Sequence, residues 1–140
     1  MKTFETSTGR VLMGRLERGD DVLGALTGLC KQQGITAGAV WAIGAVERGG
    51  VGYYDQKEGR YLENRFDSGM EIVALQGNIS QKDGEVFLHC HVVLADQEGR
   101  CFGGHLLEGN QAFACEFTIT EYRGITLNRT GDPATGLMLW

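Results

Sequence analysis

The sequence predicts an α+β domain in which a mostly antiparallel β-sheet is flanked by one or two helices. Apolar runs alternate with short polar turns that end in glycine, as in Gln81–Gly84 and Asp96–Gly99, and this pattern is typical of β-hairpins. One segment near the N-terminus instead repeats its apolar residues at helical spacing. The 140 residues include 22 glycines but one proline and are 42% hydrophobic, which favours many tight turns over disorder.

The first third of the chain contains the predicted helix between two strands. Val11–Glu17 alternates weakly and predicts the first strand. Asp20 and Asp21 are typical helix-capping residues, and the apolar residues that follow recur every three or four positions until Gly34 provides a C-terminal stop. Ala37–Val46 is rich in small and β-branched residues and predicts a buried strand.

The rest of the chain predicts strands joined by turns. The expected strands are Val51–Tyr54, Tyr61–Phe66, Glu71–Ile79, Val86–Leu94, Arg100–Gly103, Ala112–Tyr122 and Ile125–Asn128. A second short helix is predicted around His105–Asn110. The segment Gly131–Trp140 ends in four apolar residues, so we expect it to dock on the domain or on a partner subunit. With no linker or repeat, residues 1–140 are predicted to form a single domain.

Composition argues against several classes of function. The chain has 13 basic and 18 acidic side chains, a formal net charge of −5, and no basic cluster, and this charge argues against DNA as a partner. No apolar run is long enough to span a membrane and no signal peptide is visible. The four cysteines form no CxxC pair and lie in hydrophobic segments, which predicts buried, reduced thiols. We therefore expect a cytoplasmic protein with no membrane partner.

The three histidines of the chain, His89, His91 and His105, fall close together in the sequence. Glu85–Ala95 is too apolar and β-branched for a loop and predicts a strand. His89 and His91 therefore share a strand face, with Cα atoms roughly 6.5 Å apart. Two imidazoles at this separation can turn toward one metal ion, each about 2.0–2.1 Å away. Cys90 points to the opposite face and is not expected to be a ligand.

A third imidazole from a neighbouring strand would complete the set and leave other metal positions open to water or substrate. His105 follows Gly103 and Gly104, which either form a bulge or let the backbone approach the metal closely. The face that carries Phe87 and Val93 beside the histidines is otherwise apolar, so unpaired imidazoles would be costly there. We predict one divalent metal per chain, with zinc as the expected ion.

Two further residues are candidates to act beside the metal. In Ala112–Tyr122 the face from Phe113 to Ile119 is expected to be core, whereas Glu116 on the other face lies among small neighbours. Glu116 is our candidate catalytic acid–base group, and the alternative is that its carboxylate simply faces solvent. Asn78 is a candidate ligand-binding residue that would orient a ligand by donating a hydrogen bond.

Several segments together resemble a known family. They are Arg15–Asp21, Gly44–Val46, Gly69–Ile79, Phe87–Asp96 and Gly103–Gly109. These segments look like the plant and prokaryote conserved (PPC) domain, and the resemblance covers nearly the whole chain. The His-x-His motif followed by Gly-Gly-His-Leu is specific to its prokaryotic branch, which lacks an AT-hook.

The resemblance implies a compact α+β domain that forms a homotrimer and holds a metal through His89, His91 and His105. Family members are often labelled DNA-binding because plant members join this domain to AT-hooks, but no Arg-Gly-Arg-Pro motif occurs here. A further similarity, at the level of fold and site, is to acetolactate decarboxylase, which holds catalytic zinc with His-x-His and a later histidine. Such an analogy does not establish a reaction.

Three functions remain open at this point. The first is a metal-dependent enzyme, such as a lyase or hydrolase acting on a small carbonyl or carboxylate metabolite, or a binder of such a ligand. The second is a DNA-associated regulatory protein, and the third is a trimer in which the metal is purely structural. A structural zinc normally has four protein ligands, so three histidines favour an open site.

Overall fold

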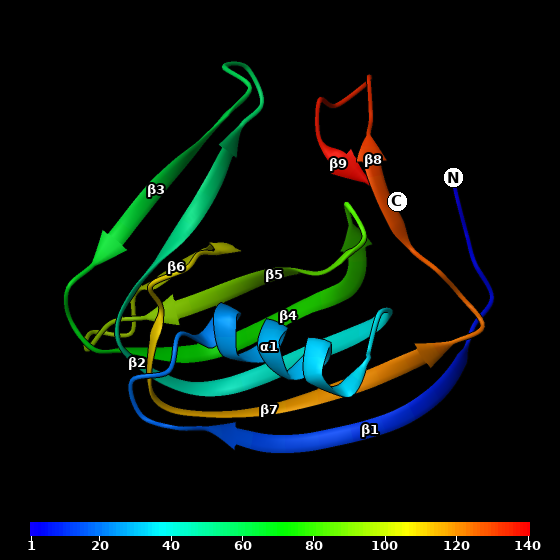
Figure 1. Cartoon of the computed structure of the whole chain (residues 1–140). Helices are drawn as coiled ribbons and strands as arrows, with labels where there is room; N and C mark the ends of the chain where they lie inside the picture. Colours follow the sequence, from blue (N-terminus) through cyan, green and yellow to red (C-terminus); the bar gives the residue numbers. More distant parts are fainter.

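The computed structural model describes residues 1–140 as a strongly curved β-sheet with one helix packed against it (Figure 1). The strands are β1 (Ser7–Leu16), β2 (Gly38–Asp55), β3 (Arg60–Phe66), β4 (Met70–Lys82), β5 (Glu85–Ala95), β6 (Cys101–Leu106), β7 (Gln111–Arg123), β8 (Asn128–Gly131) and β9 (Met138–Leu139). Almost every pairing is antiparallel, and the short contact between β4 and β8 is parallel. The predicted α+β class is confirmed.

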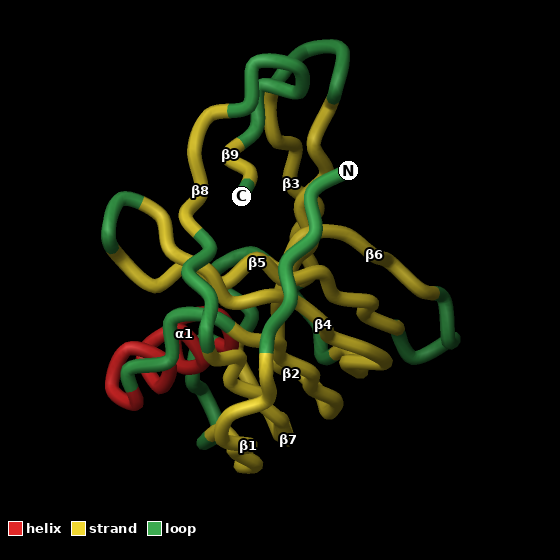
Figure 2. Tube along the Cα trace, turned by 90° about the vertical axis from the view of Figure 1, so that its right-hand side faces the viewer, coloured by secondary structure: helices red, strands yellow, loops and turns green.

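The helix α1 (Val22–Gln33) begins and ends as its sequence predicts. The Asp21 side chain caps it by accepting a 2.8 Å hydrogen bond from the Gly24 N–H. Gly34 ends it in a left-handed conformation with φ of 66°, which glycine adopts without steric cost. The helix covers one face of the sheet (Figure 2) and buries Val22, Leu26 and Cys30 against it.

Strand β2 is the centre of the topology because it pairs with four other strands. Its first half lies between β7 and β4, and its second half pairs with β3 and briefly with β6. The pairings β2–β4, β4–β5, β5–β6 and β6–β2 therefore close a ring of four strands. This closure brings β6 between β5 and the second half of β2. The β2–β3 and β8–β9 hairpins both extend from the upper part of the sheet in Figure 1.

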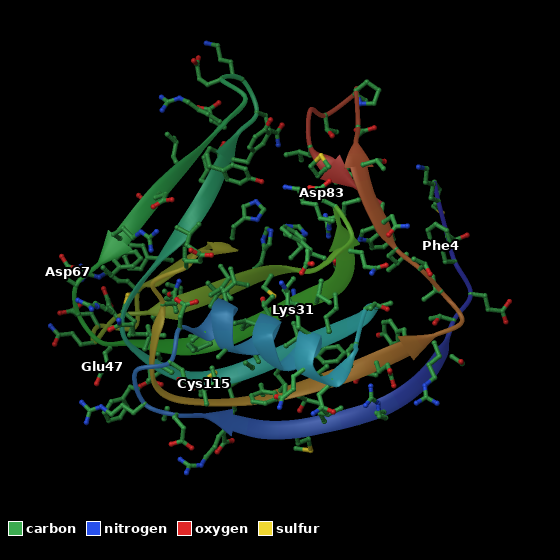
Figure 3. All side chains as sticks on the ribbon, in the orientation of Figure 1. Phe4, Lys31, Glu47, Asp67, Asp83 and Cys115 are labelled. Atoms are coloured by element: carbon green, nitrogen blue, oxygen red, sulfur yellow. The ribbon has the colours of Figure 1, made fainter.

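The hydrophobic core lies between α1 and the sheet face that it covers. Cys30, Cys90 and Cys115 are buried there, and burial raises the pKa of Cys90 to about 12. Figure 3 labels Cys115 on β7, near α1. All four cysteines are free thiols. The prediction of burial is wrong for Cys101, which is exposed at the start of β6.

The structure corrects several boundaries. Val51–Tyr54 is the second half of β2 and not a separate strand. No helix forms at His105–Asn110, because Leu106 still pairs with Val51 before the chain turns. At the far end Ile125–Leu127 is irregular, and β8 begins only at Asn128.

One face assignment on β7 is also wrong. Phe113 is 54% exposed, whereas Ala112 is fully buried. The register between β2 and β7 shifts at this point, so that Val46 pairs with Ala112 where an unbroken ladder would reach Phe113. A bulge of this kind reverses the alternation of faces, which periodicity alone does not reveal.

The segment Gly131–Trp140 docks on the domain, as expected. Its β9 strand pairs with β8, and the Trp140 ring lies 6.1 Å from the Phe4 ring. No helix in the structure has the length and apolar character needed to cross a lipid bilayer.

Candidate metal centre

The three histidines come together on adjacent strands. His89 and His91 lie on β5, and His105 lies on β6 directly opposite His91 in the antiparallel register. One ligand nitrogen from each of the three lies within 4.8 Å of the others. The ring centroids are 4.3 Å apart for His91 and His105 and 5.1 Å apart for His89 and His105. His89 and His105 are half-buried, and His91 is exposed.

Of the two glycines before His105, only Gly104 is needed for β6 to approach β2. His105 pairs with Gly52 on its other side, and a Cβ atom at Gly104 would collide with the Gly52 carbonyl. A Cβ atom at Gly103 would meet nothing closer than 3.6 Å. Position 104 therefore requires glycine and position 103 does not. The absence of a side chain at Gly104 allows the β2–β6 contact that closes the ring of strands.

Burial and positive charge keep His89 neutral. Burial, with a smaller effect of the Arg129 charge, lowers the pKa of His89 from 6.5 to about 4. Burial also lowers the pKa of His105, and the His91 charge adds to this effect. A neutral imidazole keeps a nitrogen lone pair, which is the form that binds a metal ion.

The donor set fits one divalent transition-metal ion. His89 Nε2 lies 3.2 Å from His105 Nδ1. Two nitrogens bound tetrahedrally at about 2.0–2.1 Å would be about 3.3 Å apart. The cluster contains no carboxylate. It also contains no thiolate, because Cys90 is buried on the other face of β5. Three imidazoles would leave at least one coordination position for a fourth ligand.

Asn78 lies beside the histidines, on β4 opposite His89. Its Oδ1 accepts a 2.8 Å hydrogen bond from Arg129 Nη2 and a 3.5 Å contact from Trp140 Nε1. These donors fix the orientation of the amide, so the NH₂ group is the one that remains free to donate. The role of Asn78 as an orienting donor stays a prediction.

Tyr61 stands on another side of the cluster. It comes from β3, and its ring packs edge-on against His105 with centroids 5.2 Å apart. Its other neighbour is Tyr54, whose ring centroid is 5.0 Å away. The β2–β3 hairpin therefore supplies an aromatic wall to the site.

The structure does not bring Glu116 to the histidines of its own chain. Glu116 is exposed on β7, and β2 and β4 separate β7 from β5. At about 4.8 Å per strand, this places its backbone about 14 Å from that of His91. Its side chain instead lines a shallow hollow with Met13, Trp41 and Ile43.

Sequence reasoning missed Tyr61 and Arg129. Each is a single residue with no characteristic spacing to the histidines, and each reaches the site through a hairpin whose position depends on distant pairing. The apolar segment after Gly131 was the one available signal that this part of the chain packs on the domain.

The fold and the cluster together define a small β-sheet protein with a three-histidine centre suited to a metal ion. The sequence model of the Plants and Prokaryotes Conserved (PCC) domain family matches residues 3–123, and the chain belongs to this family.

Solved structures of similar proteins share this fold. A metal-containing protein from Archaeoglobus fulgidus is 38% identical, with a TM-score of 0.95 over 100% of this chain and 99% of that one. A PPC protein from Pyrococcus horikoshii is 34% identical, with a TM-score of 0.94 over 100% and 96% of the two chains. A protein from Bacteroides thetaiotaomicron, described as a candidate DNA-binding protein, is 29% identical, with a TM-score of 0.85 over 96% and 95%.

Among curated proteins, the chain is similar to a bifunctional protein GlmU from a Synechococcus strain. The two are 33% identical over 135 residues, which is 95% of this chain. The chain spans only about a fifth of the length of the curated relatives that it matches (20% and 19%). The similarity therefore concerns one part of those longer proteins.

Proposed function

We propose that His89, His91 and His105 hold one zinc ion per chain and that the protein, as a homotrimer, binds a small oxygen-rich ligand at this centre. The observation that carries the proposal is the convergence of three imidazole nitrogens, with no acidic group among them, within 4.8 Å. The similar protein from Archaeoglobus fulgidus, which is described as metal-containing, supports it.

The choice of zinc follows from the ligand atoms. Neutral imidazoles suit zinc and its neighbours in the transition series, whereas magnesium and calcium prefer oxygen ligands. Three protein ligands with an open fourth position are typical of catalytic zinc, and four protein ligands are typical of structural zinc. Three protein ligands therefore favour a centre that binds a ligand or substrate over a purely structural one.

The ligand that we propose is a small carbonyl or carboxylate compound. A bound zinc ion would polarise such an oxygen or lower the pKa of a bound water. Three neutral imidazoles leave its double charge uncompensated, which favours an anionic ligand. Asn78 would orient the ligand through its free NH₂ group, and Tyr61 would limit its size from the side of β3.

A lyase or hydrolase is the kind of enzyme that such a site would serve, and this reaction class stays a prediction. The catalytic role of Glu116 also stays a prediction. Given its position on β7, Glu116 would have to reach the histidines of a neighbouring subunit.

The homotrimer is supported by an apolar surface on the sheet face opposite α1. Met13, Trp41 and Ile43 are 81%, 47% and 57% exposed there. Paired residues connect this surface to the site, because His91 lies opposite Gln76 and Gln76 lies opposite Trp41. Large exposed apolar patches are uncommon on monomers and mark interaction surfaces. We propose that other copies of this chain cover it.

DNA association is the second candidate, because the similar protein from Bacteroides thetaiotaomicron is described as a candidate DNA-binding protein. The net charge of −5 argues against it. Seven ion pairs on the surface join an arginine to an aspartate or glutamate, for example Arg10 to Glu121 and Arg18 to Glu47. These carboxylates neutralise part of the positive charge of the surface. Binding to a polyanion needs clustered cations that are free to displace counterions.

Thermal unfolding with citrate as the probe tests the proposed ligand site. Citrate should raise the melting temperature of the zinc-loaded protein and leave that of the EDTA-treated protein unchanged. A ligand at 100 times its dissociation constant adds about 2.7 kcal/mol to stability, which is easily measured. Equal shifts with and without zinc would refute binding at the metal, and no shift with a broad panel of carboxylates would favour a structural metal.

A further inference from the structure

Arg129 is the one charged side chain in the protein that is buried, at 7% exposure. All of its hydrogen-bond partners are neutral oxygen atoms: Ser80 Oγ at 2.8 Å, Asn78 Oδ1 at 2.8 Å and the Met138 carbonyl at 2.9 Å. No carboxylate lies within ion-pair distance, although eight ion pairs form elsewhere. A buried charge without a counter-ion is costly, so its retention calls for an explanation.

The guanidinium lies next to the three-histidine centre. It contacts Asn78, which faces His89 across the β4–β5 pair. It also lies over the ring of Phe87, 5.1 Å from its centroid, and Phe87 precedes His89 by two residues on the same strand face. Contacts with Asn78 on β4 and with Phe87 on β5 thus place Arg129 beside His89.

The hydrogen bonds of Arg129 leave part of its binding capacity unused. A guanidinium has five N–H groups. The three bonds above use the Nε–H, one N–H of Nη1 and one N–H of Nη2. One N–H therefore remains on each terminal nitrogen, and a pair of this kind matches the two oxygens of a carboxylate.

We propose that Arg129 is the anion-recognition residue of the centre, and that the ligand is a small carboxylate with a second oxygen group, such as a 2-hydroxy acid. Its carboxylate pairs with Arg129 while the second oxygen reaches the metal. This inference rests on the proposed function and adds a ligand class and a specificity-determining residue to it. Arg129 also lies outside residues 3–123, which the family model matches.

The alternative is that Arg129 only anchors β8 and β9. It does contribute to this anchoring through Ser80 and Met138. A glutamine has two N–H donors on one nitrogen, so it could keep part of this anchoring without the cost of a buried charge. The anchoring role therefore does not account for the charge, whereas recognition of an anion does.

The test compares lactate with lactamide, which has the same shape and hydroxyl group but no charge. Calorimetry on the zinc-loaded protein measures the affinity ratio of the two probes in the wild type and in Arg129→Gln. Because zinc itself favours an anion, the informative quantity is the change in this ratio between the two proteins. We expect the ratio to fall by about tenfold or more, through weaker lactate binding at unchanged lactamide affinity.

Lys82→Gln is the matched control. Lys82 pairs with Arg129 in the β4–β8 register and lies 5.7 Å from the centroid of the same Phe87 ring. Its substitution removes a nearby positive charge but leaves the paired N–H groups of Arg129 in place. The ratio of lactate to lactamide affinity should therefore change less than twofold. An equal fall in both variants would show a diffuse charge effect and overturn the assignment to Arg129.

Metal analysis and circular dichroism separate the remaining outcomes. If the wild type holds no stoichiometric zinc, the proposed function fails and this inference fails with it. If zinc is present and the ratio does not change in Arg129→Gln, only the inference fails. If that variant loses its fold or its zinc, Arg129→Lys keeps the charge but not the paired N–H groups, and the ratio should fall several-fold. An unchanged ratio in Arg129→Lys would then contradict the proposal.

Discussion

His89 Nε2 and His105 Nδ1 lie 3.2 Å apart, although the two residues come from different strands and are not opposite one another in the register. His91 is the residue that faces His105, and His89 reaches the same point from one pleat further along β5. The two nitrogens face each other across a distance close to the one that a shared metal would impose. The pairing of β5 with β6 thus brings the two nitrogens to a spacing that suits a shared ion.

The two glycines before His105 should respond differently to substitution. Gly104→Ala should destabilise the protein by several kcal/mol and reduce its zinc content, because the new methyl group would collide with the Gly52 carbonyl and push β6 away from β2. Gly103→Ala should change stability by less than about 1 kcal/mol, since its nearest neighbour is 3.6 Å away. Urea unfolding and zinc analysis of both variants measure these effects. Equal stability of the two would show that the β2–β6 contact does not position His105.

The low pKa of His89 predicts how the metal-free protein responds to pH. In the unfolded chain this imidazole binds a proton near pH 6.5, and in the folded protein only near pH 4. The unfolded state therefore holds more protons between these values, so stability is complete above about pH 6.5 and falls as the pH drops toward 4. Urea unfolding in EDTA should show this slope.

The variant His89→Gln is the control for this pH dependence. The stability of the variant should fall less steeply than that of the wild type over the same range, because the variant lacks this imidazole and its other titratable groups are unchanged. A slope equal to that of the wild type would show that His89 is not the group responsible.

The exposed face opposite α1 should hold the subunits together. Sedimentation equilibrium should give about three times the 15.3 kDa chain mass for the wild type. Ile43→Asp places a charge on this face and should yield folded monomers, because Ile43 is already 57% exposed in the single chain. Gln32→Glu, on the exposed side of α1, should leave the trimer intact. A monomeric wild type at micromolar concentration would contradict the proposed assembly.

DNA binding should be weak and independent of sequence. Fluorescence anisotropy with short duplexes in about 150 mM salt should show no saturable binding at micromolar protein, because the chain carries a net charge of −5 without a basic cluster. Tight binding that distinguishes one duplex from another would support the regulatory alternative.

The sequence predicted those parts of the fold that depend on local chemistry. The helix was recognisable because Asp21 and Gly34 mark its ends, and the hairpins because glycine follows polar residues at each turn. The length of β2 was not recognisable, because Gly49 and Gly50 look like a turn in sequence but continue the strand opposite Phe66 and Arg65. Pairing with a distant strand overrode the local preference.

The residues of the site also differ in whether local sequence or distant pairing places them. His89 and His91 were predictable because alternation on a strand is local, and His105 because all three histidines fall close together and two glycines precede it. Arg129 was not, because it arrives through the parallel contact between β4 and β8, which joins Lys82 to a residue far along the chain. The expectation for Glu116 identified an outward-facing carboxylate, but alternation cannot tell which strand lies beside β5.

Metal analysis of the purified protein tests the central claim most directly. Protein prepared without a nickel column should contain about one zinc per chain, and His89→Ala, His91→Ala and His105→Ala should each lose most of it while keeping the wild-type circular dichroism. Cys101→Ser, which removes the exposed thiol at the start of β6, should retain the metal. Wild-type protein that is free of metal and cannot be reloaded with zinc would contradict the account.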